Sequence, residues 1–496
     1  MQNKSTASTR DSKKTIQMDV VGRKLSSGKP TPLDFDAFIP WICLQWQVPK
    51  LVEVTKIFQE KYKKNDRRSS STRTKSAKSM KNKNEELESD ATKILDTDTS
   101  TTVAPAPSLP NRISIEQLAH NLDAVSLNAI YDARGYLVEV AIINCPFIIH
   151  RKVIQAINLC VPFHAFLTKL VIRGHGATSI LLHEIGKLLP HSNLTHVCLD
   201  DTGVPEGNYY VLLDQTSQLK CLSLNRCNIG DKACKELAVR IDFDGPAYSS
   251  LMVLELSSNF ITDVGAESLG NTLKMNRRLL HLNLTGNKIT DVGAKAILQH
   301  LMEFEITGSE VRHSVRRKES YIAEREIVLE KCIEEAIRQK IEVLSPNSTI
   351  KKSKSTKFKK SQLLNTVEDQ SISELAEKMT TEIMGEFDDP FCTENVVKKK
   401  IKYFSMGNMV LCSLNLSYNQ LEYPSIRMIA DVLKYQSHIA KPERATGLLR
   451  IIIDGNLIPN SCEEYKAIYL HLNKMINDKL PVNLSSRRRS SSFTKK

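Results

Sequence analysis

The chain has 496 residues, of which 41% are hydrophobic and 25% are charged, and its 69 Lys and Arg against 56 Asp and Glu give a formal net charge of +13. This composition is typical of a soluble, mostly folded protein with a large hydrophobic core. Only 19 Gly and 18 Pro are present, which excludes a collagen-like, mucin-like or wholly disordered chain.

Residues 1–110 are predicted to be largely disordered, apart from an aromatic segment at residues 33–58 that contains both tryptophans, Trp41 and Trp46. Three interpretations of this segment stay open. It covers the first folded unit, it is a linear motif for a partner because Trp is enriched at binding hot spots, or it has neither role.

The polar N-terminus lacks the apolar core of a secretory signal, and the most apolar run, residues 138–149, is shorter than the ~20 residues that a membrane span needs. We therefore expect no membrane span and an intracellular, cytoplasmic protein. The eleven cysteines show no paired clusters, so neither a disulfide framework nor a zinc site is expected.

Two stretches carry the positive charge of the chain. In the basic arm at residues 61–83, ten basic residues and one acid give +9, and residues 487–496 add +5, which leaves 13 − 14 = −1 for the rest. Both stretches are poor in apolar residues, which indicates disorder. Three interpretations of these stretches stay open. They are solvated tails, they are phosphorylation switches through serines such as Ser70 and Ser491, or they are tags for nuclear import or nucleic-acid binding.

Residues 111–304 are predicted to form a helical cap followed by the first units of a repeat. Within residues 114–131, Ser114 and Gln117 are spaced like a capping box, and Leu118, Leu122 and Val125 fall on one helical face. These spacings predict a helix that covers the start of the repeats.

The pattern L-x-x-L-x-L-x-x-N/C-x-L then recurs along the chain. Eight units are counted, with three apolar positions and a closing position in each: Leu137, Val140, Ile142 and Cys145; Leu167, Leu170, Ile172 and His175; Leu194, Val197, Leu199 and Thr202; Leu219, Leu222, Leu224 and Cys227; Leu251, Leu254, Leu256 and Asn259; Leu279, Leu282, Leu284 and Asn287; Leu411, Leu414, Leu416 and Asn419; Leu448, Ile451, Ile453 and Asn456.

Each unit is predicted to be a short strand followed by a helix. After the closing residue of one unit, Thr262 or Asp263 can cap a helix whose apolar face includes Ala266, Leu269 and Leu273. A buried asparagine can both donate and accept hydrogen bonds where the strand ends, which assigns a structural role to Asn259, Asn287, Asn419 and Asn456. Stacked units place parallel strands inside a curve and helices outside it.

A charged insert at residues 305–405 interrupts the repeats and is predicted to be partly helical. Its composition favours a long charged helix at residues 311–344 and a second helix at residues 371–384, with a basic link at residues 351–360. The insert is either a solvent-exposed excursion or a docking element. Residues 406–478 hold the last repeats and a C-terminal helix, and residues 479–496 are predicted to be a disordered basic tail.

Over residues 137–460 the chain resembles leucine-rich repeat proteins of the ribonuclease-inhibitor-like class, because the units quoted above carry the pattern of that class. The resemblance implies an α/β solenoid, a horseshoe with parallel strands on its concave face and helices on its convex face. The interrupted array with a long charged insert is also similar to leucine-rich repeat proteins associated with ciliated and sperm cells, which implies a ciliary setting.

No motif for catalysis, a cofactor or a metal is found in the sequence. The glycine-rich stretch Arg173-Gly174-His175-Gly176 falls on the turn after a predicted strand, and Cys227 and Cys234 fall on core positions. We therefore expect no enzyme activity, no cofactor and no small-molecule substrate.

Alternation along the strands places the third, fifth and seventh positions of each unit on the concave face. These positions are small, mixed in charge and free of aromatic residues, which favours polar contacts that depend on avidity over tight binding. An ordinary solvated face is the alternative. The candidate partner-binding residues are Lys169, Arg173, His196, Asp200, Asn225, Glu255, His281, Asn283, Asn415, Arg450 and Asp454.

The function that the sequence favours is a non-catalytic scaffold for protein partners, with basic arms that attach to an acidic assembly such as the microtubule surface of a cilium or axoneme. One alternative is a GTPase regulator similar to the Ran-activating repeat proteins, although those end in an acidic region and this chain ends in a basic one. Another is a nuclear protein that binds nucleic acid through the arms.

Overall fold

The computed structural model describes residues 29–59, 124–344, 367–392, 395–439, 447–459 and 462–479. The basic arm at residues 61–83, nearly all of the C-terminal tail, and Ser70 and Ser491 lie outside these residues. The first half of the predicted helical cap, up to residue 123, also lies outside them.

The central element is a ten-stranded sheet with the strand order β1-β2-β3-β4-β5-β6-β7-β8-β12-β13. All neighbouring strands are parallel except β2 and β3, which are antiparallel. The strands are β1 Leu51–Phe58, β2 Ala124–Tyr131, β3 Leu137–Ile143, β4 Lys169–Arg173, β5 His196–Cys198, β6 Cys221–Ser223, β7 Val253–Glu255, β8 His281–Asn283, β12 Ser413–Asn415 and β13 Arg450–Ile452.

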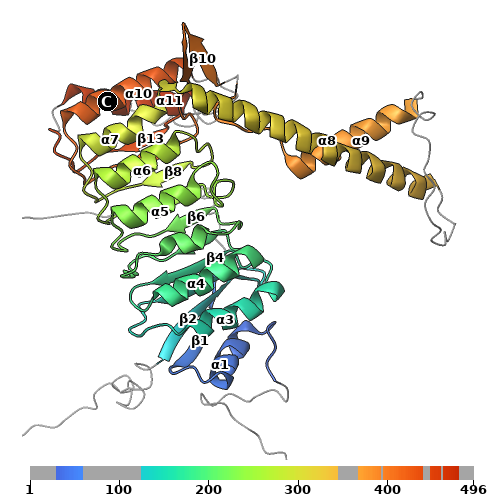
Figure 1. Cartoon of the computed structure of the whole chain (residues 1–496). Coiled ribbons are helices and arrows are strands. Elements are labelled where there is room, and N and C mark those ends of the chain that lie inside the picture. The colour runs from blue at the N-terminus through green and yellow to red at the C-terminus, as the bar shows by residue number, and fades with distance from the viewer. Residues whose placement is uncertain are drawn as a thin grey trace, which may run out of the picture.

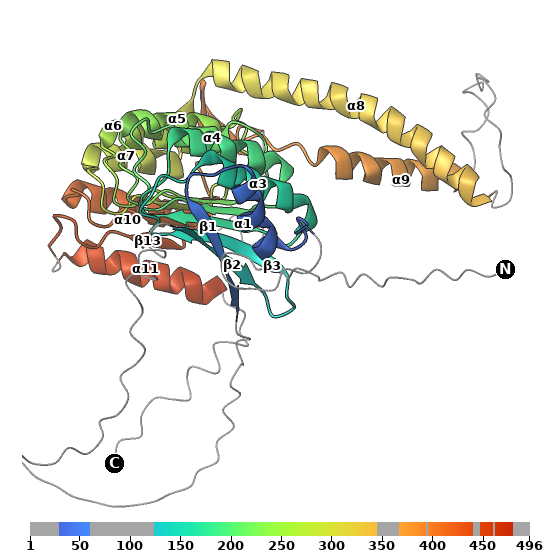
Figure 2. The same cartoon turned by 90° about the horizontal axis from the view of Figure 1, so that it is seen from below.

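Helices alternate with these strands along the chain and, except for the last helix at Glu463–Lys479, stack in a second layer (Figures 1 and 2). They are α1 Phe35–Gln45, α3 Arg151–Cys160, α4 Ser179–Leu188, α5 Asp231–Ile241, α6 Asp263–Leu273, α7 Asp291–Leu298, α10 Tyr423–Ile439 and α11 Glu463–Lys479, with short 3₁₀ turns at Val161–Phe163, Leu189–His191, Tyr209–Leu213 and Gln299–Leu301. Figure 2 shows α4 to α7 on one side of the sheet. We call the opposite side of the strands the open face.

The central apolar residues of all eight predicted units lie side by side in one row across the sheet. The row runs through Val140, Leu170, Val197, Leu222, Leu254, Leu282, Leu414 and Ile451, in that order. Each of these side chains is buried in the core between the sheet and the helices. The prediction that these leucines lie on neighbouring strands is therefore confirmed.

The closing asparagines hold each unit to the one before it. The Asn259 side chain accepts from the N–H groups of Cys227 and Ile229 at 2.9 and 3.0 Å, and it donates to the Leu224 carbonyl at 2.9 Å. Asn287, Asn419 and Asn456 make equivalent bonds. Each side chain thus pairs backbone groups that the end of a strand would leave unsatisfied.

A second set of hydrogen bonds between neighbouring units explains why the sequence Thr-Asp-Val-Gly recurs at the helix starts. Thr290 caps its own helix, because its hydroxyl accepts from the Val292 N–H at 3.2 Å. Asp263 of the preceding unit accepts from the N–H groups of Thr290 and Gly293 at 2.8 and 2.9 Å. A Cβ on Gly293 would lie 2.5 Å from the Asp263 carboxylate, so glycine is required for this contact. The threonine, and not the aspartate, is therefore the cap.

The predicted helix at residues 114–131 is wrong over its described part, because residues 124–131 form strand β2. Val125, Leu127 and Ala129 alternate and are all buried, as expected for a strand that pairs on both sides. Pairing with β1 and β3 outweighs the predicted helical spacing. Of the three residues on that helical face, only Val125 lies in β2.

The aromatic segment at residues 33–58 is not part of a disordered region, because it forms α1 and the edge strand β1. Phe35, Phe38 and Ile39 of α1 are buried, and Trp41 and Trp46 pack against the same core. The segment covers the first repeat, which is one of its three predicted roles.

The charged insert forms an arm that projects from the body (Figures 1 and 2). Helix α8, Gly308–Leu344, and helix α9, Val367–Met384, pack together around Cys332, Ala336 and Ala376, so both predicted helices are present. At about 1.5 Å per residue the 37 residues of α8 extend roughly 55 Å. Three further strands, β9 Phe304–Ile306, β10 Val396–Lys399 and β11 Lys402–Ser405, form a small antiparallel sheet at its base.

Polar contacts with little access to water hold the base of the arm. The buried Asp389 carboxylate accepts from Arg317 at 2.6 Å and from the Ser314 hydroxyl at 2.8 Å. Lys274, directly after α6, pairs with Glu310 of α8 at 2.5 Å. The bonds to the buried Asp389 charge join α8 to the end of the insert, and the pair between Lys274 and Glu310 joins the arm to the repeats.

Candidate protein interface

The predicted partner-binding residues all lie along the open face of the sheet. Five of the strands carry Lys169 and Arg173 (β4), His196 (β5), Glu255 (β7), His281 and Asn283 (β8) and Asn415 (β12), and Arg450 begins β13. Asp200, Asn225 and Asp454 each lie two residues after the end of their strand. The structure therefore brings the whole predicted set onto one surface, although nothing in it tests whether a partner binds there.

Ion pairs connect the residues at the β3 to β5 end of this face. Lys169 lies 3.1 Å from Glu139, and Arg173 lies 3.5 Å from Asp200. Arg173 also donates to the Cys198 sulfur at 3.6 Å, and this contact, together with Asp200, raises the pKa of Arg173. Burial raises the pKa of the Cys198 thiol, so this cysteine is not an activated nucleophile.

A hydrogen-bonded chain of side chains continues across β6 and β7. The Asp200 carboxylate accepts from the Ser223 hydroxyl at 2.6 Å and from the Asn225 N–H at 3.0 Å. The Asn225 side chain donates to Ser223 at 2.9 Å and accepts from the Ser257 hydroxyl at 2.6 Å. Most polar groups of this stretch are therefore already paired with one another.

Glu255 is the centre of the next group. His281 lies 2.9 Å from one carboxylate oxygen, and the Asn283 amide donates to the other at 2.5 Å. Burial raises the pKa of Glu255, but the hydrogen bonds from His281 and Asn283 outweigh it, so the pKa lies below its usual value. The carboxylate therefore stays charged and keeps both partners in place.

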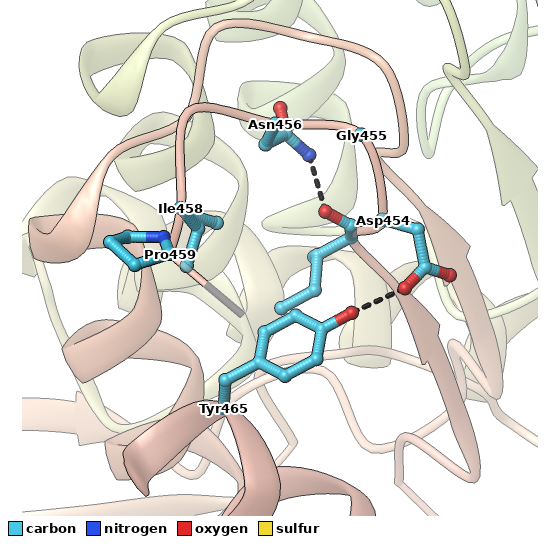
Figure 3. A pocket seen from close by; sticks show the side chains of 7 residues that line it. Asp454, Gly455, Asn456, Ile458, Pro459 and Tyr465 are labelled. Atoms are coloured by element: carbon cyan, nitrogen blue, oxygen red, sulfur yellow. Dashed lines mark hydrogen bonds between the residues drawn. The ribbon is translucent and has the colours of Figure 1, made fainter. Parts of the chain in front are cut away.

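A pocket of about 490 Å³ lies beyond the last strand and is lined by Ile453, Asp454, Gly455, Asn456, Ile458, Pro459 and Tyr465. Figure 3 shows Tyr465 of α11 pointing at the Asp454 carboxylate, to which its hydroxyl donates. Asn456 donates to the Ile453 carbonyl at 2.7 Å. Burial, and then the bond to Asp454, raises the pKa of Tyr465, so its hydroxyl keeps its proton at neutral pH.

No group of three or more His, Cys, Asp or Glu among the described residues is arranged to hold a metal ion. None of the eleven cysteines, which all lie in the described ranges, forms a disulfide. None of the helices searched in the described ranges is long and apolar enough to cross a membrane.

The sequence missed the pairing within the face. Glu139, which pairs with Lys169, was not singled out, because the two residues lie on strands of neighbouring units and no spacing along the chain encodes their contact. The glycine turn at Arg173-Gly174-His175-Gly176 is structural, as expected: a Cβ on Gly176 would lie 2.3 Å from the Phe147 carbonyl oxygen.

A family model described as "Leucine Rich repeat" matches residues 217–238, 249–270 and 276–298. The chain therefore carries leucine-rich repeats of the ribonuclease-inhibitor-like type in residues 217–298. The strands β6, β7 and β8 lie in these three matches. No curated protein matches the chain.

Proposed function

We propose that the chain is a non-catalytic scaffold that binds partner proteins with two surfaces, the open face and the α8–α9 arm. Leucine-rich repeats are in general protein-binding modules, and these repeats support that class of function. The observation that carries the proposal is the base of the arm, where Glu310 pairs with Lys274 of the repeats at 2.5 Å and the Arg317 guanidinium lies 4.9 Å from the centre of the Phe243 ring.

This base matters because it holds two surfaces in a constant relative position. Two weak contacts on one rigid body give avidity only when a partner can reach both at once. The open face suits a weak contact, since its residues are polar and already hydrogen-bonded to one another. The arm adds the second contact, and exposed apolar residues such as Ile322 and Ile327 lie on its surface.

The finer proposal concerns shape and cellular setting. We infer that the stack curves into the horseshoe of the ribonuclease-inhibitor-like class, with the open face on its concave side. The interrupted array is similar to that of leucine-rich repeat-containing protein 71, whose relatives are associated with ciliated and sperm cells. An acidic microtubule surface is then a partner that the basic stretches at residues 61–83 and 487–496 would fit.

The scaffold proposal is tested with partners captured on the full chain and identified, followed by affinity measurements on variants. The first variant replaces residues 323–382 by a short Gly-Ser linker, which keeps Asp389, Arg317 and the bond between Tyr321 and the Gly385 carbonyl. The second combines Lys169→Glu and Arg450→Glu on the open face. A matched control, Lys235→Glu with Lys295→Glu, places the same charge change on exposed helix positions.

We expect both test variants to weaken binding of the same partner about tenfold or more, and the control to leave it unchanged. Equal effects of test and control variants, or none, would contradict the scaffold proposal. The microtubule attachment is tested separately by co-sedimentation of the full chain with microtubules. Removal of residues 61–83 and 487–496 should abolish co-sedimentation. Co-sedimentation that persists without them would exclude attachment through these basic stretches.

A further inference from the structure

The two edge strands of the ten-stranded sheet differ in length and in what packs beside them. At the C-terminal end the edge strand β13 has three residues, and α11 packs beside it with Ile468 and Leu472 in the core. At the N-terminal end the edge strand β1 has eight residues, and within the described ranges it pairs with β2 alone. Figure 2 looks onto this end, where β1 and α1 lie in front of the stack.

The backbone of β1 presents hydrogen-bonding groups to this free side. Gln59, directly after β1, donates its N–H to the Tyr131 carbonyl of β2 at 2.9 Å, and Phe58 is paired in register with Tyr131. In a parallel ladder the odd-numbered residues of β1 therefore face β2, and the N–H and C=O groups of Val52, Val54, Lys56 and Phe58 point away from it. Such an edge is a template for another strand.

Apolar side chains lie near both ends of β1, whereas Glu53 and Lys56 between them are charged. Leu51 and Ile57 are 39% and 41% exposed on the open face, and the pairing of β1 with β2 contains no bulge. On the helix side, Ala37, Trp41 and Leu44 form an apolar stripe along α1 at i, i+4 and i+7. Edge strands of monomeric proteins are usually blunted by bulges, prolines or charges.

We propose that β1 pairs antiparallel with β1 of a second copy of this chain, with Val54 on the two-fold axis. A two-fold axis perpendicular to the sheet keeps the faces of both strands aligned. In this register Leu51 lies opposite Ile57 of the partner subunit, and Glu53 lies opposite Thr55 of the partner subunit. An axis through Thr55 would instead place Glu53 against the partner's Ile57, which cross-strand pairing disfavours.

The self-complementary order of apolar, acidic, hydroxyl and apolar side chains on one face favours a second copy over an unrelated strand. The dimer would join two sheets into one and cover the apolar stripe of α1. It does not depend on the proposed scaffold function, since the measurement below involves no other partner.

Sedimentation equilibrium of the full chain should show a concentration-dependent dimer. Ile57→Lys places an ammonium group opposite the partner's Leu51 at both symmetric positions, and we expect the Kd of the dimer to rise about tenfold or more. The matched control is Ile143→Lys, on the same face and 43% exposed, but on β3 and away from the edge. It should leave the Kd unchanged.

The register is tested by a Leu51→Cys/Ile57→Cys double variant. Residues 51 and 57 would be non-hydrogen-bonded pairs with Cα atoms about 4.5 Å apart, a distance that a disulfide can span. Within one chain the two positions lie roughly 20 Å apart, so an internal bond cannot form. Under mild oxidation the double variant should give a covalent dimer, and each single variant should behave like the unmodified chain.

A chain that stays monomeric at every concentration would overturn the proposal. So would a dimer that Ile57→Lys leaves intact, or single cysteine variants that cross-link as well as the double variant. A monomer in which the amides of Val52 and Val54 are protected from hydrogen exchange would assign the edge to another segment of the same chain. A dimer that Ile57→Lys and Ile143→Lys weaken equally would also overturn it.

Discussion

Leu282 and Leu414 lie side by side on the paired parallel strands β8 and β12, although the whole α8–α9 arm separates them in the chain. The arm therefore leaves and rejoins the stack between two neighbouring strands without disturbing their register. Both side chains are fully buried in one hydrophobic core, so the repeats on either side of the insert form one folded unit.

Removing either leucine should destabilise this unit. Leu282→Ala and Leu414→Ala each leave a cavity between sheet and helices, and we expect each to lower the free energy of unfolding by about 2–5 kcal/mol. The measurement is chemical denaturation of the full chain, with the exposed Val292→Ala on α7 as the control. A loss below about 1 kcal/mol for Leu414→Ala would contradict its place in the core.

Asn287 should matter far more than an exposed asparagine of the same fold. Its side chain bonds the Ile261 N–H at 3.1 Å and the Leu256 and Leu284 carbonyls at 3.0 and 2.9 Å, all in the buried turn. Asn287→Ala leaves these groups unpaired, and we expect a loss of about 2–4 kcal/mol. The exposed Asn271→Ala on α6 should change the denaturation midpoint little. Equal destabilisation by the two substitutions would argue against a stabilising role for the asparagine hydrogen bonds.

The base of the arm contains one buried and one half-exposed ion pair, and the two can be compared by substitution. Asp389→Asn removes the charge that Arg317 faces in the interior, and we expect it to destabilise the arm by about 3–5 kcal/mol. Asp388→Asn breaks a half-exposed pair with Arg278 at 3.0 Å, which should cost about 0–1 kcal/mol. Hydrogen exchange of residues 308–321 measures both, and faster exchange is expected only for Asp389→Asn.

The row of repeat leucines could be predicted from the sequence because each unit repeats the same local spacing, so that Leu222, Leu254 and Leu282 occupy one position. Contacts between units could not be predicted in this way. Asp263 looked like a helix cap, yet it bonds the next unit. Asp389 and Glu139 carry no local pattern, since their partners Arg317 and Lys169 come from other elements.

The N-terminal end shows the same limit for strands. Val125 fits a helical spacing with two upstream leucines, but it pairs with Val52 of β1, and Leu127 of the same strand pairs with Ile142 of β3. Alternation over a short stretch is a weak local preference, and pairing with distant strands decides the outcome. For the candidate site, the location of the residues could be predicted, because alternation along the strands places them on one face. Their hydrogen bonds and ion pairs with one another could not be predicted.

A last prediction concerns His300, which is buried after α7 with its ring 5.1 Å from that of Phe304. Burial, and then the positive charge of Lys274, lowers the pKa of His300 from 6.5 to about 4. The unfolded chain therefore binds a proton between these two values while the folded chain does not, so the stability present above pH 6.5 is lost as the pH falls toward 4. His300→Gln should remove roughly 2 kcal/mol of this loss between pH 7 and 4.5 in denaturation experiments. The exposed His191→Gln is the control, and a pH dependence that both variants share with the unmodified chain would show that His300 does not cause it.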